Sequence, residues 1–304
     1  MSGSVLYDVP GPRAIARNRI LGVVSVLVVA AIIGFFVWRL AATGQFSAQK
    51  WSAFTYTNVW LNIGQAALRT LSAFAAAGAG ALVLGFVLAL GRLSDHAWVR
   101  VPFTAVIELL RAVPVLVFMF LLYYGFPVIG LRMEPYWAVV IALIAYNGSV
   151  LAEVIRAGVE SLPRGQREAG YAIGLRKAGV MRLVLLPQAI RAMLPVIIAQ
   201  LVVTLKDTAL GFIITYPELL FYAKYLGSQS SIGSPIVPAT IVTGAIYIAL
   251  CLALSGVAIL AERKLRSSPR TIRVAGAEPP SQVGTDTELI AAQRGLGKYD
   301  GTSW

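Results

Sequence analysis

Six long apolar runs, separated by shorter polar segments, set the pattern of this chain. With a window of ~19 residues they predict membrane-spanning helices at Ile20–Leu40, Ala66–Leu90, Val101–Tyr124, Tyr136–Val154, Leu194–Asp207 and Ile236–Leu260. The fifth run is the least continuous, because Gln200, Thr204 and Lys206 interrupt it and Pro195 stands in its first turn. Polar interruptions of this kind indicate a helix that lines a cavity.

The apolar runs and the polar segments divide the chain into four parts. Residues 1–19, which include Pro10-Gly11-Pro12, are not expected to form a long helix. Residues 20–65 hold the first span and an external loop, and residues 66–262 form a core of five helices with a cytoplasmic loop at 159–190. Residues 263–304 lack apolar periodicity and are expected to be a disordered cytoplasmic tail. The sequence therefore predicts an all-α integral membrane protein with about six transmembrane helices.

The composition supports this class and explains the net charge. Hydrophobic residues make up 58% of the chain and charged residues 13%, against about 25% charged residues in soluble domains. With the N-terminus inside, most Lys and Arg residues fall in cytoplasmic segments, and the external ones are Arg39, Lys50, Arg132 and Lys224. Cytoplasmic loops of membrane proteins carry such an excess. The net charge of +12 thus indicates a membrane surface and no nucleic acid, with both termini in the cytoplasm.

Two features of the first two spans concern anchoring and packing. The first apolar run exceeds the ~7–15 residues of a signal peptide, so we interpret it as a retained anchor. The second span carries small residues at four-residue spacing, which let helix backbones approach closely in lipid: Ala73, Ala77, Ala81, Gly85 and Ala89. We favour packing within this chain over a subunit interface for this stripe.

Ionisable side chains occur inside several predicted spans, where a charge at the bilayer centre costs at least ~2.5–3.5 kcal/mol on insertion scales. Glu108 and Arg111 in the third span are three residues apart, a spacing at which they can pair. Glu153 and Arg156 repeat this spacing in the fourth span, and we interpret them as a structural ion pair. In each pair, the two opposite charges would neutralise each other within one helix.

Other polar residues in the spans have either a structural or a transport role. Arg111, Asn147 and Lys206 could face the bundle interior or a polar pathway. Lys206 and Asp207 are adjacent and point apart, so each needs a separate partner. A pathway that uses Arg and Lys would suit a solute that bears a carboxylate.

A polar, basic segment between the fourth and fifth spans predicts two short cytoplasmic helices. The first is expected at Arg167–Ala178, with Gly179 as its stop, and the second at Val180–Leu186, ended by Pro187. The apolar side chains of this segment need a cover: Ala169, Ala172, Ile173 and Leu175. Because the segment is tethered to membrane spans at both ends, we expect a protein partner rather than DNA.

The same segment resembles the Glu-Ala-Ala loop of ABC-importer permeases. Residues Glu168, Ala169, Gly174, Leu186 and Pro187 match in spacing, while Gly170 and Val184 stand where the family has Ala and Ile. In that family the loop is a coupling helix that inserts into the ATPase subunit. The resemblance implies a type I importer permease fold, with ATPase coupling through Glu168, Ala169, Gly170, Gly174, Leu186 and Pro187.

Further motifs are similar to those of the polar amino-acid permeases of bacterial plasma membranes. They are Arg111-Ala-Val-Pro114, Tyr146-Asn147-Gly148, Ser161-Leu-Pro163-Arg-Gly165-Gln166, Leu186-Pro187-Gln188-Ala189 and Leu205-Lys206-Asp207-Thr208. The segment from Val5 to Pro12, with the long tail, looks more specifically like a glutamate-uptake permease. The candidate pathway residues are then Glu108, Arg111, Asn147, Lys206, Asp207 and Thr208.

The resemblance also implies the partners. These are two ABC ATPase subunits, a second permease subunit, identical or related, an extracytoplasmic binding protein and the amino-acid substrate. This chain lacks a Walker A sequence, because Ala292 and Tyr299 flank its one Gly-Lys pair where the motif needs Gly and Ser or Thr. We therefore expect no enzyme activity and no cofactor in this chain, with ATP and Mg²⁺ bound by the partner ATPase.

Two other function classes stay open from the residues alone. An ion-coupled secondary transporter could use Glu108, Glu153 or Asp207 to carry protons, although no pair of inverted halves is evident. A membrane-embedded enzyme lacks a nucleophile–base or metal constellation, since the chain has one His and one Cys. No metal site is expected.

Overall fold

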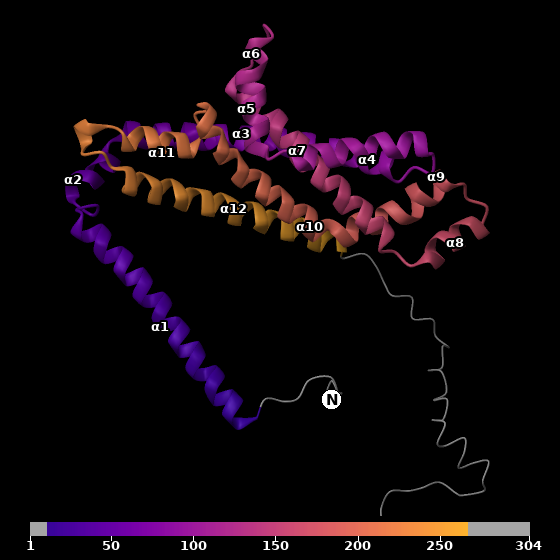
Figure 1. The fold of residues 1–304 in the computed structure, drawn as a ribbon, viewed down its shortest axis with the longest axis horizontal. Helices are drawn as coiled ribbons and strands as arrows, with labels where there is room; N and C mark the ends of the chain where they lie inside the picture. The colour runs from indigo at the N-terminus through magenta and orange to yellow at the C-terminus, as the bar shows by residue number, and fades with distance from the viewer. Residues whose placement is uncertain (1–10, 267–304) are drawn as a thin grey trace, which may run out of the picture. The chain divides into compact units, whose positions relative to one another are not determined.

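The computed structural model describes residues 11–266, which form helices and short connections without any strand. The tail expected to be disordered from residue 263 differs at its start, because residues 263–266 belong to the last helix. The disorder expected for residues 267–304 and the Val5–Pro10 part of the N-terminal motif lie outside the described residues. The helices of Figure 1 are α1 (Pro12–Ala42), α2 (Ala48–Trp51), α3 (Thr57–Arg92), α4 (Ala97–Ala112), α5 (Val115–Phe120), α6 (Phe126–Val128), α7 (Pro135–Glu160), α8 (Arg164–Ala172), α9 (Lys177–Gly179), α10 (Leu186–Asp207), α11 (Leu219–Gly227) and α12 (Ile236–Arg266). The predicted all-α class is confirmed.

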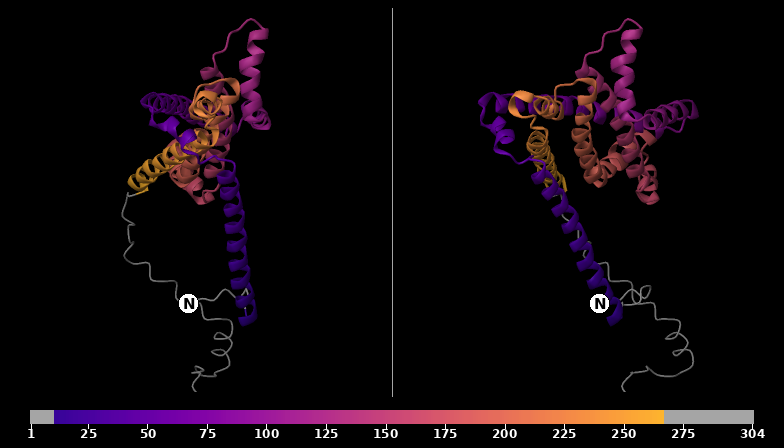
Figure 2. Two further views of the ribbon diagram at one scale, coloured as in Figure 1. Left: turned by 90° about the vertical axis from the view of Figure 1, so that its left-hand side faces the viewer. Right: turned by 60° about the vertical axis from the view of Figure 1, so that its left-hand side comes forward.

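The described residues contain five helices long and apolar enough to span a membrane, or six if a bent pair counts as one span. The bent pair is the third predicted span, Val101–Tyr124, which is not one straight helix. Its two parts meet at 93°, and α5 and α6 leave the line of α4 in both views of Figure 2. Pro114 causes the break, because proline lacks the N–H of a continuing helix and holds Val113 in an extended conformation.

The starts of two helices differ from the predicted boundaries. Helix α1 begins at Pro12, so the last part of the segment 1–19 is helical. Proline is well suited to a first helical turn, where its missing N–H has no partner in any case. Helix α3 begins at Thr57 rather than Ala66, which puts the predicted domain boundary between 65 and 66 inside a helix.

Helices α3 and α7 form the centre of the membrane core. The small-residue stripe of α3 is buried here, and a Cβ on Gly85 would lie 2.8 Å from Leu151 Cβ and 2.9 Å from the Gly148 carbonyl oxygen. Such close backbone approach requires glycine. The prediction that the stripe packs within this chain is confirmed.

The second predicted cytoplasmic helix does not end at Pro187. Helix α9 continues through a π-helical stretch at Val180–Leu185 directly into α10, where Pro187 occupies the first turn. A similar π-helical stretch at Leu121–Gly125 precedes Pro127. A wider turn before proline relieves the clash of the ring with the preceding carbonyls. The fifth span therefore extends without a break from Lys177 to Ile214.

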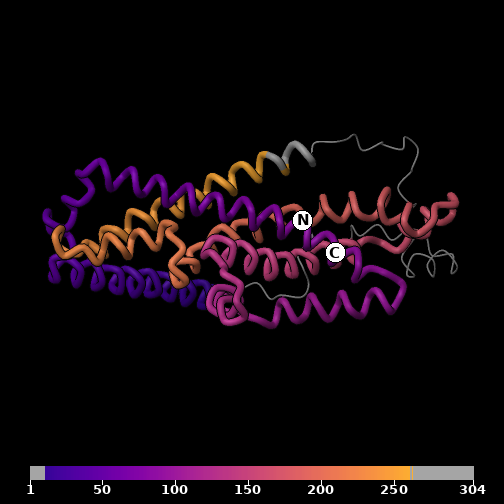
Figure 3. The backbone as a smooth tube through the Cα atoms, turned by 90° about the horizontal axis from the view of Figure 1, so that it is seen from above, coloured from indigo at the N-terminus to yellow at the C-terminus, as the bar shows by residue number. Residues whose placement is uncertain are grey.

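Helix α11 lies along the first half of α3 and is joined to α12 (Figure 3). Val59, Ile63 and Ala66 of α3 form one apolar cluster with residues of α11 and with Ala239 of α12. Before α11, Glu218 accepts hydrogen bonds from the backbone N–H groups of Leu220 (2.8 Å) and Phe221 (2.7 Å). This cap fixes the start of α11.

Candidate functional site

The coupling segment contains one short exposed helix, α8, with a well-defined end. The chain leaves α8 through Gly174, whose φ is +81°. The Leu175 N–H donates to the Gly170 carbonyl (3.1 Å) and the Gly174 N–H to the Tyr171 carbonyl (2.9 Å), as in a Schellman motif. The predicted helix Arg167–Ala178 with a stop at Gly179 is therefore wrong, because Gly174 takes the left-handed position and ends the helix first.

One face of α8 is open to a partner. Glu168, Ala169 and Ala172 are exposed, and Ile173 has 76% of its surface exposed. Leu175 differs from the prediction, since it packs against a cluster in this chain that includes Val159 and Val180. The surface that needs a cover is thus confined to α8 and Ile173.

The opposite side of α8 is fixed to the body of the protein. Gly170 is buried, and a Cβ at this position would lie 2.8 Å from Cγ2 of Val180, which is itself fully buried. This contact explains why glycine stands at position 170, where the family has alanine. Gln188 of α10 adds a hydrogen bond to Gln166 of α8 (3.4 Å).

The structure places the six predicted coupling residues in three settings. Glu168 and Ala169 lie on the exposed face of α8, while Gly170 and Gly174 shape the helix and its end. Leu186 is buried with Leu88 and Ile155 in the membrane core. Pro187 is exposed in the first turn of α10. The first four are positioned for docking or for loop shape, and Leu186 connects the loop to the bundle.

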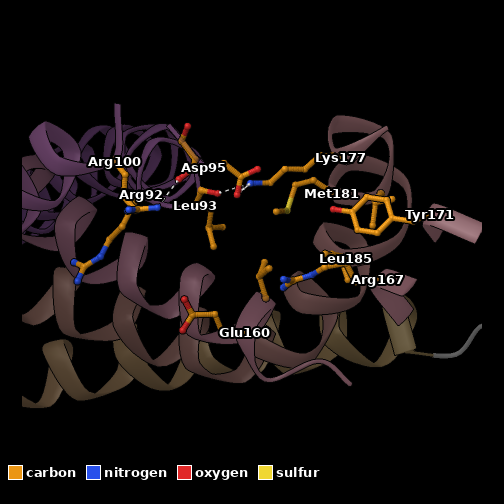
Figure 4. A pocket seen from close by; sticks show the side chains of 13 residues that line it. Arg92, Leu93, Asp95, Arg100, Glu160, Arg167, Tyr171, Lys177, Met181 and Leu185 are labelled. Carbon is orange, nitrogen blue, oxygen red and sulfur yellow. Dashed lines mark hydrogen bonds and ion pairs between the residues drawn. The ribbon is translucent and has the colours of Figure 1, made fainter. Parts of the chain in front are cut away.

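A cavity of about 290 Å³ separates α8 and α9 from the loop between α3 and α4 (Figure 4). Lys177 of α9 crosses it to form an ion pair with Asp95, and its Nζ also donates to the Leu93 carbonyl (3.3 Å). The hydrogen bond from Lys177 lowers the pKa of the Asp95 carboxyl. Arg167 and Tyr171 of α8 line the far side of the cavity. The first cytoplasmic loop is thereby linked to the coupling segment.

Arg92, Glu108 and Glu153 form a charged cluster beside this cavity, and it differs from one predicted ion pair. Arg92 at the end of α3 contacts Glu153 at 2.6 Å and Glu108 at 3.6 Å. The predicted Glu108–Arg111 pair does not form, because Glu108 is directed to Arg92 and Arg111 is exposed near the break of the third span. The predicted Glu153–Arg156 pair is confirmed at 3.1 Å.

Asn147 is fully buried between α7 and α10. Its Nδ2 donates to the Leu143 carbonyl (3.1 Å), and its Oδ1 accepts from Gln200 Nε2 (2.7 Å). Interhelical amide hydrogen bonds of this kind stabilise helix pairs in membranes. In this conformation the Asn147 side chain serves as a helix-to-helix contact.

The candidates at the end of α10 point in different directions. Lys206 is exposed, Asp207 is half-buried and Thr208 is buried, where its hydroxyl donates to the Leu205 carbonyl (2.6 Å). The expectation that Lys206 and Asp207 do not share a partner agrees with this arrangement. Arg111 and Lys206 are exposed, whereas Asn147 is fully buried.

Two features outside the predicted set stand out. Arg69 lies within α3 and lines two cavities. It is not among the predicted pathway residues, although the criterion that selects Arg111, an ionisable residue within a span, applies to it equally. Glu218 is fully buried and accepts a hydrogen bond from the Tyr247 hydroxyl of α12 (2.6 Å). Nothing in the sequence alone indicates that Glu218 and Tyr247 are in contact.

Comparison with known proteins identifies the family. Residues 81–267 match the model of the binding-protein-dependent transport system inner membrane component. The chain belongs to this family of ABC-importer permeases. The match covers the helices from the middle of α3 to the end of α12, including the coupling segment.

Relatives and solved structures narrow the family to amino-acid importers. This permease is 38% identical over 233 residues to the glutamate transport system permease protein GluD of Corynebacterium glutamicum, covering 75% of this chain and 84% of that protein. It is 31% identical over 192 residues to the arginine transport system permease protein ArtQ of Bacillus subtilis, covering 62% and 84%. A crystal structure of an amino acid ABC transporter with histidines superposes with a TM-score of 0.62 at 29% identity, covering 70% of this permease and 97% of that chain.

The family settles several questions that the residues alone left open. The chain is a multi-pass inner-membrane permease of an amino-acid ABC importer with the importer permease fold. It is a transport component rather than an enzyme, and its family works with an ATPase and a substrate-binding protein. The ion-coupled secondary transporter is not favoured by any of these relatives.

Proposed function

We propose that this permease forms half of the translocation pathway of an ATP-driven glutamate importer. The likeness to the glutamate permease of Corynebacterium glutamicum supports the substrate. The N-terminal motif that resembles glutamate-uptake permeases adds to this support, and it lies outside the matched family region. Both termini are placed in the cytoplasm, since this orientation puts the basic α8–α9 segment inside.

The exposed face of α8 is the observation that carries the coupling role. A short helix with an exposed carboxylate and a largely uncovered isoleucine is held by buried contacts on its other side. This exposed face belongs to the segment that resembles the coupling helix of ABC-importer permeases, so we assign the docking of the ATPase to it. In the assembled transporter each of two permease subunits would dock one ATPase through residues 161–187.

Energy is then supplied outside this chain. ATP and Mg²⁺ bind to the two ATPase subunits, and closure of the ATPase pair moves α8. The linkage of Lys177 to Asp95 and of Arg92 to Glu153 passes that motion to α3 and α7. The second permease subunit, identical or related, completes the pathway, and an external binding protein delivers the amino acid.

Uptake by proteoliposomes tests this function directly. The complex that co-purifies with the permease is reconstituted with ATP and Mg²⁺ in the lumen and binding protein outside, and labelled glutamate is supplied. We expect uptake that requires lumenal ATP and is competed by aspartate or glutamine to a measurable degree. Uptake driven by an ion gradient without ATP would contradict the proposal, and ATP-dependent uptake of another amino acid in place of glutamate would contradict the substrate.

A double substitution tests the coupling loop within the same assay. Glu168→Lys with Gly174→Asp places a reversed charge on the docking face and a side chain at a left-handed position. We expect transport to be lost while the protein remains inserted in the membrane. Persistent uptake at the wild-type rate would show that α8 does not dock the ATPase. For the pathway, Lys206→Ala should weaken uptake of acidic substrates more than of neutral ones.

A further inference from the structure

A polar stripe runs along the exposed side of the first half of α3. Asn62, Gln65, Arg69 and Ser72 follow one another at spacings of three and four residues, and all four are exposed in this chain. The adjacent face of the same helix carries Val59, Ile63 and Ala66, which pack on α11 and α12. A stripe with two amides and a guanidinium is not suited to acyl chains, so this side of α3 faces a polar space.

The length of α3 places the stripe near the outer end of the membrane. Arg92 ends α3 on the cytoplasmic side in the proposed orientation. The 23 residues from Arg69 to Arg92 correspond to ~35 Å at 1.5 Å per residue, slightly more than the ~30 Å hydrocarbon thickness. Arg69 therefore lies at the outer boundary, where a solute released by an external binding protein enters.

Arg69 stands between two cavities. The first has a volume of about 260 Å³ and is lined by Asn62 and Gln65 of α3 and by Tyr222 and Tyr225 of α11. The second, of about 320 Å³, is lined by residues that include Glu134 and Tyr216. Arg69 and Pro217 line both. The first cavity thus offers one cation together with amide and phenol groups, with a volume suited to a small polar solute.

No carboxylate lines the first cavity with Arg69, although Glu134 shares the second cavity with it. None of the ion pairs among the described residues includes Arg69. Glu218, which precedes α11, is already taken up by two backbone N–H groups and the Tyr247 hydroxyl. A guanidinium at the edge of the membrane, next to an open cavity and without a carboxylate of its own, is a ready acceptor site for a carboxylate ligand.

We propose that Arg69 binds the side-chain carboxylate of an acidic amino acid in the cavity between α3 and α11, and that this contact selects acidic over neutral substrates at the pathway entrance. The inference rests on the proposed import of glutamate and names the residue that distinguishes it from glutamine. The amides of Asn62 and Gln65 and the hydroxyl of Tyr222 supply hydrogen bonds that either substrate can use. Within this cavity, the guanidinium supplies the interaction that requires the charge of glutamate, because it can donate two parallel hydrogen bonds to a carboxylate.

The test measures binding without the binding protein, since that protein has its own selectivity. The purified permease–ATPase complex in lipid nanodiscs is titrated with labelled glutamate and with labelled glutamine, and the same preparation is assayed for uptake in proteoliposomes. We expect Arg69→Gln to weaken glutamate binding by about tenfold or more and to leave glutamine binding within about twofold. Arg69→Lys keeps the charge but loses the bidentate geometry, and should lie between.

Arg132→Gln is the matched control, because Arg132 is also exposed on the external side and lines neither cavity. It should bind both amino acids like the wild type. Equal glutamate affinity in Arg69→Gln and wild type would overturn the inference while leaving import of glutamate intact. A wild-type complex that transports glutamate but does not bind it in the absence of the binding protein would also overturn the inference. Failure of the wild-type complex to take up glutamate at all would instead refute the proposed function.

Discussion

Gly170 is the position at which a single methyl group should reveal how the coupling helix is held. A Cβ added there would lie 2.8 Å from Val180 Cγ2 and 3.3 Å from its Cγ1. Val180 cannot turn away easily, because a β-branched side chain is stiff at χ1 and this one is fully buried. Gly170→Ala should therefore loosen the contact between α8 and the π-helical stretch that leads into α10.

The expected magnitude follows from two opposing effects. Alanine favours the helix over glycine by up to about 1 kcal/mol, whereas overpacking a buried contact costs about 1–3 kcal/mol. Gly165→Ala in the same helix is the matched control, since no heavy atom lies within 4 Å of its added Cβ. The difference between the two variants isolates the contact with Val180 at about 1–3 kcal/mol, or about 5- to 150-fold in an opening equilibrium.

Hydrogen–deuterium exchange of the α8–α9 amides in the purified permease–ATPase complex measures this opening. We expect faster exchange in Gly170→Ala than in Gly165→Ala, and slower transport at equal protein levels. Val180→Ala removes both methyl groups that meet the added Cβ. Val180→Ala alone should lower the free energy of opening the α8–α9 segment by about 1.6 kcal/mol, at about 0.8 kcal/mol for each buried carbon removed. The double variant should be less open than the two single effects predict.

Two outcomes would refute this reasoning. If Gly170→Ala exchanged as slowly as Gly165→Ala, the buried contact with Val180 would not determine the position of α8. If the double variant were as open as the sum of its parts, Gly170 and Val180 would not be coupled, and the glycine would need a different explanation.

Three further predictions concern the same loop and the external side. Asp95→Lys and Lys177→Asp should each lower transport-coupled ATP hydrolysis, because the Asp95–Lys177 pair joins the first cytoplasmic loop to α9. The double variant, in which the charges are exchanged, should restore hydrolysis. Two additive losses in the hydrolysis assay would count against this linkage. Gly174→Ala forces a Cβ to a φ of +81° at a cost of about 1–2 kcal/mol, so exchange of the last α8 amides should rise by about 5- to 30-fold, and unchanged exchange would argue against the Schellman end. Burial raises the pKa of Glu218 from 4.5 to about 7, so the folded state binds this proton more tightly than the unfolded chain. The stability that Glu218 contributes is then fully present below pH 4.5 and is lost as the pH rises through about 7. The unfolding temperature should decline over this range in the wild type and not in Glu218→Gln, and an identical profile in both proteins would disprove this prediction.

The sequence alone determined the class and the family resemblance, and it predicted six spans, the third of which is a bent pair of helices. Apolar runs of membrane length report on the helices themselves, since every backbone polar group in lipid must be satisfied within its own segment. The spacing of small residues in α3 predicted its packing correctly, because the stripe repeats on one face of a helix. The motif around Glu168 and Gly174 identified the coupling segment, although it left the helix ends uncertain.

Tertiary structure decided which side chains meet and where helices stop. The sequence predicted Gly179 as the stop of the coupling helix, but the helix ends before Gly174, which takes the left-handed conformation. Local spacing paired Glu108 with Arg111, but the end of α3 brings Arg92 to Glu108 and Glu153 from a distant part of the chain. The surroundings of Arg69 depend on how α11 packs beside α3. Ion pairs and hydrogen bonds between side chains far apart in sequence leave no spacing signal in either helix, so only the fold could supply them.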